Sequence, residues 1–222
     1  MSRTDSVPDI ASNLATLCAR INSVAGERQV TLVAVSKGKD ASLVERAIAA
    51  GQTVFGENRV QEAAAKFPAL RRDHGGIVVH MIGALQVNKA RDAVRLFDEI
   101  ESLDRPKLAD ALANAADREG KLPYLLVQVN IGDEPQKSGV PREDADDFIR
   151  AMRHRFGKNL RGLMAIPPAG VDPAPYFREL VAMADQHGLP VRSIGMSGDF
   201  EIAIRCGATQ VRIGSRLFGR RG

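Results

Sequence analysis

The sequence has no tryptophan, only two tyrosines and only two cysteines in 222 residues. Cys18 and Cys206 lie in helix-like segments and lack the close spacing of metal-binding cysteines, so no thiolate metal site is indicated. A disulfide between them stays an alternative. Such sparse cysteine usage is more typical of a protein of the reducing cytoplasm, which is the expected location.

Long apolar runs are also missing. No stretch approaches the length of a membrane-spanning helix, and the N-terminal residues lack the apolar core of a secretory signal. We therefore expect no membrane association.

Charge of one sign is not concentrated anywhere except at Arg220-Arg221, which we interpret as a solvated tail. The formal net charge is +4, but basic and acidic residues are interspersed and aromatic residues make up only 5%. This pattern argues against a nucleic-acid-binding surface. A mildly positive field instead favours phosphate esters as ligands.

Strand-like and helix-like segments alternate along the chain. After an opening helix at Pro8–Val24, eight apolar runs read as strands: Val30–Lys37, Thr53–Glu57, Val78–Gly83, Glu99–Leu103, Tyr124–Asn130, Leu160–Ile166, Val191–Ser197 and Gln210–Gly214. Eight such units in one chain predict a single α/β domain over residues 1–222, a (β/α)8 TIM barrel with an extra N-terminal helix. A doubly wound open sheet is the alternative, although it usually has fewer strands.

Helix boundaries are marked by capping residues. Asp40 is a candidate N-cap for a helix that ends at Gly51, and Asp172 is a candidate N-cap followed by a proline at the first helical position. Ser197 is a candidate N-cap for a short last helix that ends at Gly207.

Lys37 follows the first apolar strand, and this position predicts unusual chemistry. In a parallel barrel the carboxyl ends of all strands face one mouth, where active sites lie. Desolvation there lowers the pKa of a lysine and yields a neutral amine that can form a Schiff base. The last two strands supply Ser197-Gly198 and Gly214-Ser215, whose backbone amides and hydroxyls suit a phosphate. A phosphorylated aldehyde, pyridoxal 5'-phosphate (PLP), could react with Lys37 through its aldehyde and bind the two Ser/Gly segments through its phosphate.

Several motifs resemble one known family in order and across nearly the whole chain. They are Leu32-Val-Ala-Val-Ser-Lys37, Phe55-Gly-Glu-Asn-Arg-Val-Gln-Glu62, His80-Met-Ile-Gly83, Gln86-Val-Asn-Lys89, Val129-Asn-Ile131 with Lys137-Ser-Gly139, Gly195-Met-Ser-Gly-Asp199 and Val211-Arg-Ile-Gly-Ser215. The chain is therefore similar to the YggS/PROSC family of pyridoxal phosphate homeostasis proteins. That family resembles the barrel of alanine racemase-type enzymes, which are fold-type III PLP enzymes.

The resemblance implies roles for individual residues. Lys37 would form the Schiff base with PLP, and Arg212 would face the pyridine nitrogen. Ser197, Gly198, Gly214 and Ser215 would hold the phosphate. Asn58, at the end of a predicted strand, is a further expected cofactor-binding residue, and the alternative is that it caps the following helix. An arginine stays cationic, so it disfavours protonation of the pyridine and weakens the cofactor as an electron sink.

The chain departs from the family pattern at three positions. Ala84 and Val87 stand where histidine and serine are common, which leaves open the role of the loop that they occupy. Ser215 stands where threonine is common and keeps the hydroxyl.

Two functions compete on this site. The first is an intracellular PLP homeostasis protein or carrier without robust catalysis, which would deliver PLP to apo enzymes as a monomer or weak dimer. The second is a PLP-dependent amino-acid racemase or related enzyme, which needs a second acid/base opposite the lysine. Tyr124 and Tyr176 are not expected at the mouth, and no second domain is expected to supply another tyrosine. No catalytic residue is assigned. A barrel aldolase that uses Lys37 on a sugar phosphate is a third possibility.

Three further residues have alternative interpretations. Glu57 could contact ligand or pair with a neighbour such as Arg59. His80 is interpreted as a core histidine with satisfied hydrogen bonds. Asn130 could lie under the cofactor ring or bond to a neighbouring loop.

Overall fold

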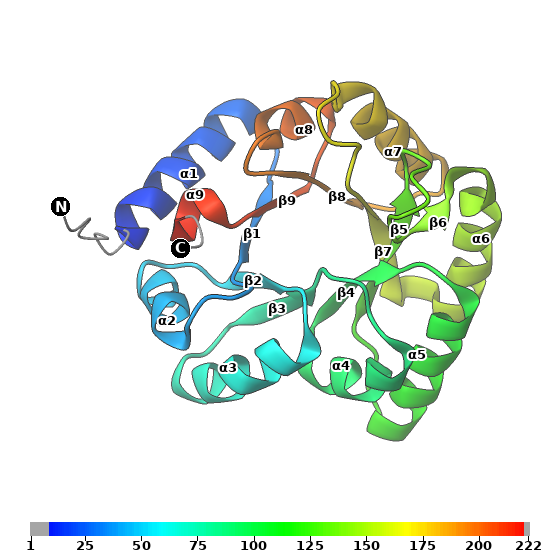
Figure 1. The fold of residues 1–222 in the computed structure, drawn as a ribbon, viewed down its shortest axis with the longest axis horizontal. Helices are drawn as coiled ribbons and strands as arrows, with labels where there is room; N and C mark the ends of the chain where they lie inside the picture. The colour runs from blue at the N-terminus through cyan, green and yellow to red at the C-terminus, as the bar shows by residue number, and fades with distance from the viewer. Residues whose placement is uncertain (1–8, 220–222) are drawn as a thin grey trace.

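The computed structural model describes residues 9–219, and a closed barrel of parallel strands lies at its centre (Figure 1). The strands follow one another around the barrel in the order β4-β3-β2-β1-β9-β8-β7-β5, and β4 also pairs with β5, which closes the ring. The eight barrel strands are β1 Thr31–Val35, β2 Val54–Glu57, β3 Val78–Met81, β4 Glu99–Leu103, β5 Tyr124–Asn130, β7 Leu160–Ala165, β8 Val191–Met196 and β9 Gln210–Ile213. The predicted (β/α)8 barrel is confirmed.

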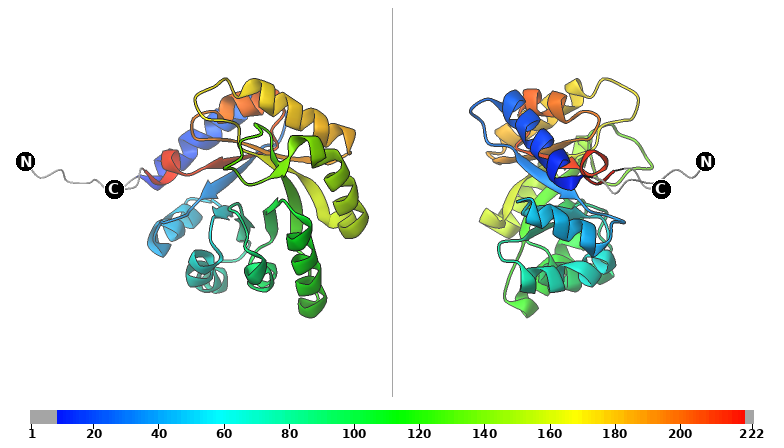
Figure 2. Two further views of the ribbon diagram at one scale, coloured as in Figure 1. Left: turned by 45° about the vertical axis from the view of Figure 1, so that its right-hand side comes forward. Right: turned by 90° about the vertical axis from the view of Figure 1, so that its left-hand side faces the viewer.

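Helices surround the barrel in an outer ring (Figures 1 and 2). Their apolar faces form one large core with the outward side chains of the strands. The α-helices are α1 Ile10–Ala25, α2 Ala41–Ala49, α3 Val60–Asp73, α4 Ala90–Leu96, α5 Pro106–Glu119, α6 Ala145–Phe156, α7 Ala174–Gln186, α8 Phe200–Cys206 and α9 Ser215–Phe218, with short 3₁₀ turns η1 Val87–Lys89, η2 Arg142–Asp144 and η3 Gly157–Asn159. Within residues 9–219, no helix is both long enough and apolar enough to cross a membrane.

The extra N-terminal helix is α1, whose buried stripe contains Ile10, Leu14, Leu17 and Ile21. This stripe packs on α8 and α9, so the two ends of the described chain lie side by side. The predicted start of the helix at Pro8 lies outside the described residues, as does the Arg220-Arg221 tail.

Several predicted boundaries differ from the structure. The first strand ends at Val35, so Lys37 lies two residues beyond it. Ser197 is not the N-cap of α8, because Asp199 occupies that position and its carboxylate accepts a hydrogen bond from the Met196 amide at 2.6 Å.

The predicted N-cap is confirmed for α2 and wrong for α7. Asp40 is the N-cap of α2, but its side chain makes no capping hydrogen bond. Pro173, rather than Asp172, is the N-cap of α7, although Asp172 Oδ1 accepts from the Ala174 amide at 3.0 Å. Two elements with no counterpart in the prediction are β6 and α9. Strand β6, Val140–Pro141, pairs with the end of β5 outside the closed ring, and α9 follows the helix that was predicted to be the last.

Candidate functional site

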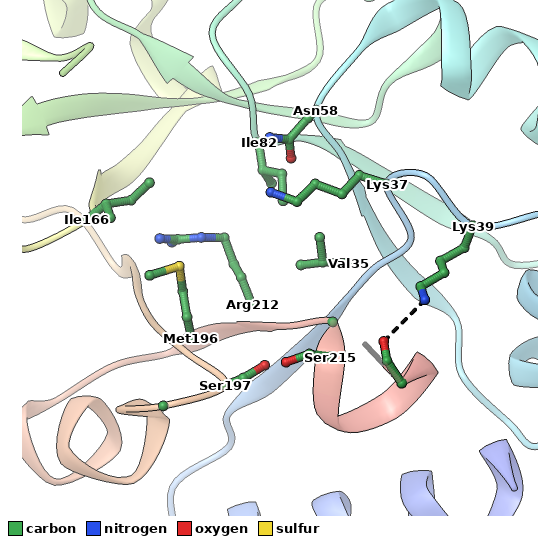
Figure 3. A pocket seen from close by; sticks show the side chains of 13 residues that line it. Val35, Lys37, Lys39, Asn58, Ile82, Ile166, Met196, Ser197, Arg212 and Ser215 are labelled. Atoms are coloured by element: carbon green, nitrogen blue, oxygen red, sulfur yellow. Dashed lines mark hydrogen bonds between the residues drawn. The ribbon is translucent and has the colours of Figure 1, made fainter. Parts of the chain in front are cut away.

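A pocket of about 510 Å³ opens at the carboxyl ends of the barrel strands (Figure 3). This volume lies within the range of small-molecule and cofactor sites. Its lining residues come from both ends of the chain: Val35, Lys37, Lys39, Asn58, Ile82, Ile166, Met196, Ser197, Gly198, Arg212, Gly214, Ser215 and Gly219. Strands β1 and β9 are neighbours in the ring, so closure of the barrel brings these distant segments together.

Every residue that the sequence predicts for the cofactor site lies in this one pocket. The seven are Lys37, Asn58, Ser197, Gly198, Arg212, Gly214 and Ser215. Their individual roles toward a cofactor stay predictions, but the structure gathers them in one place.

One end of the pocket carries the lysine. Lys37 is half-buried, and in Figure 3 its amino group and the Asn58 amide point into the same part of the pocket. Asn58 Oδ1 is buried and accepts no hydrogen bond from the described residues. Gly83 packs directly against the Asn58 backbone, and a Cβ at this glycine would clash with it. The backbone of Asn58 is thus fixed, while its side-chain oxygen is an acceptor that a ligand could use.

The other end of the pocket carries hydroxyls. In Figure 3 the side chains of Ser197 and Ser215 point toward each other from the β8 and β9 sides. The two glycines next to these serines, Gly198 and Gly214, differ in the space that a side chain would have. A Cβ on Gly198 would meet no atom within 4 Å, whereas one on Gly214 would lie 3.0 Å from the carbonyl oxygen of Val35. Gly214 is therefore also required for packing against β1, while Gly198 leaves open space beside the two hydroxyls.

Arg212 lies between these two ends and is only 4% exposed. Its Nη1 donates to the Ser193 carbonyl at 2.5 Å and to the Ser193 hydroxyl at 2.7 Å, and its Nη2 donates to the Ala165 carbonyl at 3.0 Å. These contacts use three of the five guanidinium N–H donors and leave the Nε–H and one Nη2–H as donors for a ligand. Burial lowers the pKa of Arg212, and the charge of Glu101 opposes this effect.

A buried polar network beneath Arg212 was missed by the sequence analysis. Glu101 Oε2 accepts from the Ser193 hydroxyl at 2.5 Å and lies 3.8 Å from Arg212 Nη1. Glu101 Oε1 lies 2.9 Å from His80 Nδ1. Strands β4 and β8 are not neighbours in the ring, so the bond between Glu101 and Ser193 crosses the barrel interior.

The charge states of the network follow from its contacts. Burial by itself lowers the pKa of His80, but the hydrogen bond to Glu101 and the nearby carboxylates outweigh it and raise that pKa. Burial raises the pKa of Glu101, yet the His80 hydrogen bond and the charges of His80 and Arg212 hold it below its usual range. Burial raises the pKa of Glu99, whose Oε1 accepts from Gln210 Nε2 at 3.1 Å.

This network resembles a metal site only in composition. The ligand atoms of His80, Glu99 and Glu101 lie within 4.8 Å of one another. However, they bond to each other, and the Arg212 guanidinium adds a positive charge beside them. The interpretation of His80 as a core histidine with satisfied hydrogen bonds agrees with these contacts.

The segment that carries Lys37 has its own buried ion pair. Glu57 does not pair with Arg59; instead its Oε1 lies 2.5 Å from Lys66 Nζ, and Arg59 pairs with Glu62. The sequence analysis missed Lys66, which comes from the middle of α3. The sequence signal was weak, because a lysine in an amphipathic helix is normally solvated.

Asn130 bonds to a neighbouring loop, as one of its two interpretations expected. Its amide donates to the carbonyl of Glu134 at 2.9 Å, and its Oδ1 accepts from the Glu134 amide at 3.2 Å. It lies in a smaller hollow next to the main pocket, together with the exposed Ala84. Val87 begins the 3₁₀ turn η1.

Comparison with known proteins places this site in a family. Residues 8–222 match the family described as alanine racemase, N-terminal domain. The chain is 40% identical over 229 residues to the pyridoxal phosphate homeostasis protein of Escherichia coli K12, covering 96% of this chain and 97% of that protein. It is 41% identical over 225 residues to the protein of the same name from Pseudomonas aeruginosa, covering 96% of each. The chain belongs to the pyridoxal phosphate homeostasis protein family.

Solved structures of other proteins have the same fold as this chain. PipY of Synechococcus elongatus, in a structure with PLP bound, is 36% identical with a TM-score of 0.80, covering 95% of this chain and all of PipY. Alanine racemase of Clostridium difficile shares the fold at 16% identity with a TM-score of 0.70, and the match covers 95% of this chain but only 57% of that enzyme. The family predicted from the sequence motifs is confirmed.

Proposed function

We propose that this protein binds PLP at the mouth of its barrel and acts in intracellular PLP homeostasis as a carrier of the cofactor. One observation carries the proposal: an amine and a pair of hydroxyls lie in one pocket, with the buried Arg212 between them. PLP has an aldehyde, a ring nitrogen and a phosphate, which correspond to these three features. The family membership and the relative with PLP bound support the same assignment.

Each end of the pocket has a separate task in holding the cofactor. Lys37 would hold it as a Schiff base, in which the amine nitrogen bonds to the aldehyde carbon and the aldehyde oxygen leaves as water. The hydroxyls of Ser197 and Ser215, together with backbone amides at Gly198 and Gly214, would hold the phosphate. The open space beside Gly198 and the unbonded Asn58 Oδ1 both fit a ligand in this position.

Arg212 favours carriage over catalysis. When bound, PLP supplies an electron sink for carbanion chemistry, and that sink is strongest when the pyridine nitrogen is protonated. The Arg212 guanidinium is held by the Ser193 and Ala165 carbonyls and is a donor, so a nitrogen facing it accepts a hydrogen bond and stays unprotonated.

The racemase alternative needs a second acid/base. In the described part of the pocket, the acid/base candidate beside Lys37 is Lys39, whose Nζ donates to the carbonyl oxygens of Phe218 at 3.3 Å and Gly219 at 3.1 Å.

The side chains that line the pocket include no tyrosine, histidine or carboxylate among residues 9–219. Tyr124 is 46% exposed at the start of β5, where it lies beneath the Arg161 guanidinium, and Tyr176 lies on α7. Neither tyrosine reaches the pocket that holds Lys37.

The carrier proposal extends to partners and location. A cofactor held at an open barrel mouth could be loaded and released, so apo PLP-dependent enzymes of the cytoplasm are the proposed recipients. The protein would do this as a monomer or weak dimer.

The deciding experiment is borohydride reduction of the protein mixed with PLP, followed by peptide mass spectrometry. We expect a visible Schiff base band and a covalent adduct on Lys37, both lost in Lys37→Ala. The matched control is Lys121→Ala, which removes a lysine at the opposite end of the barrel, where it donates to the Arg95 carbonyl. An adduct on another lysine, or none in the wild type, would refute the assignment. Transfer to an apo enzyme with little turnover of amino acids would then separate carrier from racemase.

A further inference from the structure

The backbone on both sides of Lys37 is held by a single side chain from α3. Lys66 Nζ donates to the carbonyl oxygen of Ser36 at 2.9 Å and to that of Lys39 at 3.2 Å. These two carbonyls bracket Lys37 in the segment between β1 and α2. A further contact from α3 reaches the same segment, because Glu62 Oε2 accepts from the Gly38 amide at 2.9 Å.

The same ammonium is neutralised by a buried carboxylate. Lys66 Nζ lies 2.5 Å from Glu57 Oε1, and the side chains of Lys66 and Glu57 are 10% and 0% exposed. Glu57 Oε1 also accepts from the Ser36 hydroxyl at 2.7 Å. An ammonium has three N–H donors, and here it meets three acceptors, two of which belong to the Lys37 segment.

This arrangement is more specific than a structural ion pair requires. A buried pair needs only mutual neutralisation and satisfied hydrogen bonds, and replacing it by apolar residues is often neutral for stability. Here the ion pair joins β2 and α3 to the two carbonyls next to the reactive lysine. Lys66 itself does not line the cofactor pocket, so any effect on the site passes through the segment that it holds.

We propose that Lys66, neutralised by Glu57, is a positioning residue that fixes the Lys37 segment for Schiff base formation. The inference rests on the proposed PLP function. A segment that is already ordered loses less conformational entropy when its lysine becomes covalently fixed, so preorganisation strengthens the covalent part of binding. The phosphate and ring contacts from β8 and β9 do not depend on Lys66.

The test uses the double variant Lys66→Met/Glu57→Gln. Lys66→Met alone would leave the Glu57 charge buried without its partner and could prevent folding. The double variant removes both charges, keeps an acceptor for the Ser36 hydroxyl and removes the Lys66 donor from both backbone carbonyls. Among the described residues, the Ser36 carbonyl keeps only its turn bond from the Lys39 amide at 3.1 Å. The matched control is Lys121→Met, which removes another lysine-to-carbonyl hydrogen bond far from the pocket.

Two ligands separate positioning from general damage. PLP binds through ring, phosphate and aldehyde, whereas pyridoxine 5'-phosphate has an alcohol in place of the aldehyde and binds only through ring and phosphate. We expect the double variant to lose about fivefold to tenfold in PLP affinity, as for one side chain that is no longer preorganised. Its affinity for pyridoxine 5'-phosphate should stay within about twofold of the wild type.

The outcomes are distinguishable. Equal loss for both ligands would show general damage to the pocket and refute positioning by Lys66. Unchanged affinity for both ligands would refute it as well, provided that the wild type forms the borohydride-fixed adduct on Lys37. Failure of the wild type to form that adduct would refute the proposed PLP function itself, and the positioning role with it.

Discussion

Replacing Glu101 by glutamine tests whether the charge inside the barrel is required for the native state. The substitution keeps the size of the side chain and removes its negative charge. His80 and Arg212, which lie 2.9 Å and 3.8 Å from the two carboxylate oxygens, would then share the interior with no charged Glu101. The Ser193 hydroxyl would keep an acceptor, so the loss comes mainly from electrostatics.

The expected loss is large. Breaking a buried ion pair by removing one partner destabilises a protein by about 3–5 kcal/mol. For a chain of this length each kcal/mol lowers the Tm by about 2–4 °C, so we expect a fall of about 6–20 °C. A surface pair gives the control, because Arg20 and Glu201 lie 2.6 Å apart with side chains 52% and 26% exposed. Glu201→Gln should destabilise the protein much less, because solvent screens an exposed ion pair.

The assay is urea unfolding followed by circular dichroism at pH 7, with both variants and the wild type compared at a common m-value. A double-mutant cycle with His80→Gln would report the coupling between the two side chains directly. If Glu101→Gln were no more destabilising than Glu201→Gln, the assignment of a charged Glu101 between two cations would be wrong.

Two further predictions follow from single positions. Gly198→Ala should leave the free energy of unfolding within about 0.5 kcal/mol of wild type, because a Cβ there meets no protein atom within 4 Å. It should nevertheless weaken PLP binding, measured by equilibrium titration. Gly75→Ala, at an equally open position, is the control, and equal effects of the two variants on PLP binding would argue against a phosphate beside Gly198. The raised pKa of His80 means that its charged form stabilises the native state fully below the ordinary value of 6.5, and that this contribution is lost as pH rises through the raised folded-state pKa. His80→Gln should therefore flatten the alkaline decline of stability in urea titrations, and a decline of unchanged slope would contradict the contact-based assignment.

Local signals predicted the strands and the members of the pocket. Polar residues follow several of the predicted strands, and parallel strands place those ends at one mouth. Lys37 and Ser215 could therefore be assigned to one site although they lie at opposite ends of the chain. Helix caps were less reliable. Asp199 and Ser197 are both good capping residues, and the choice between them depends on the turn that follows β8.

The interior network could not be predicted in the same way. Glu101 and Ser193 are 92 residues apart and meet only because the closed ring brings β4 and β8, which are not neighbours, to the same interior. The sequence does contain a partial signal. Glu99 and Glu101 alternate on one strand, and two carboxylates on one face of a strand buried at every residue demand partners. Identifying those partners requires the registers across the barrel.

The buried ionic network contributes less to stability than apolar packing would, which argues that its role is to orient Arg212 at the pocket. Barrel interiors are usually filled by branched apolar side chains, and a buried ionic network is seldom more stable than such packing. Here the network ends at Arg212, whose two Nη atoms are both held by β7 and β8 acceptors while Glu101 balances its charge. An arginine fixed in this way keeps its remaining N–H donors, on Nε and Nη2, in fixed directions. The interior of the barrel therefore contains a guanidinium of fixed direction in place of apolar packing, as the proposed hydrogen bond to a ring nitrogen would require.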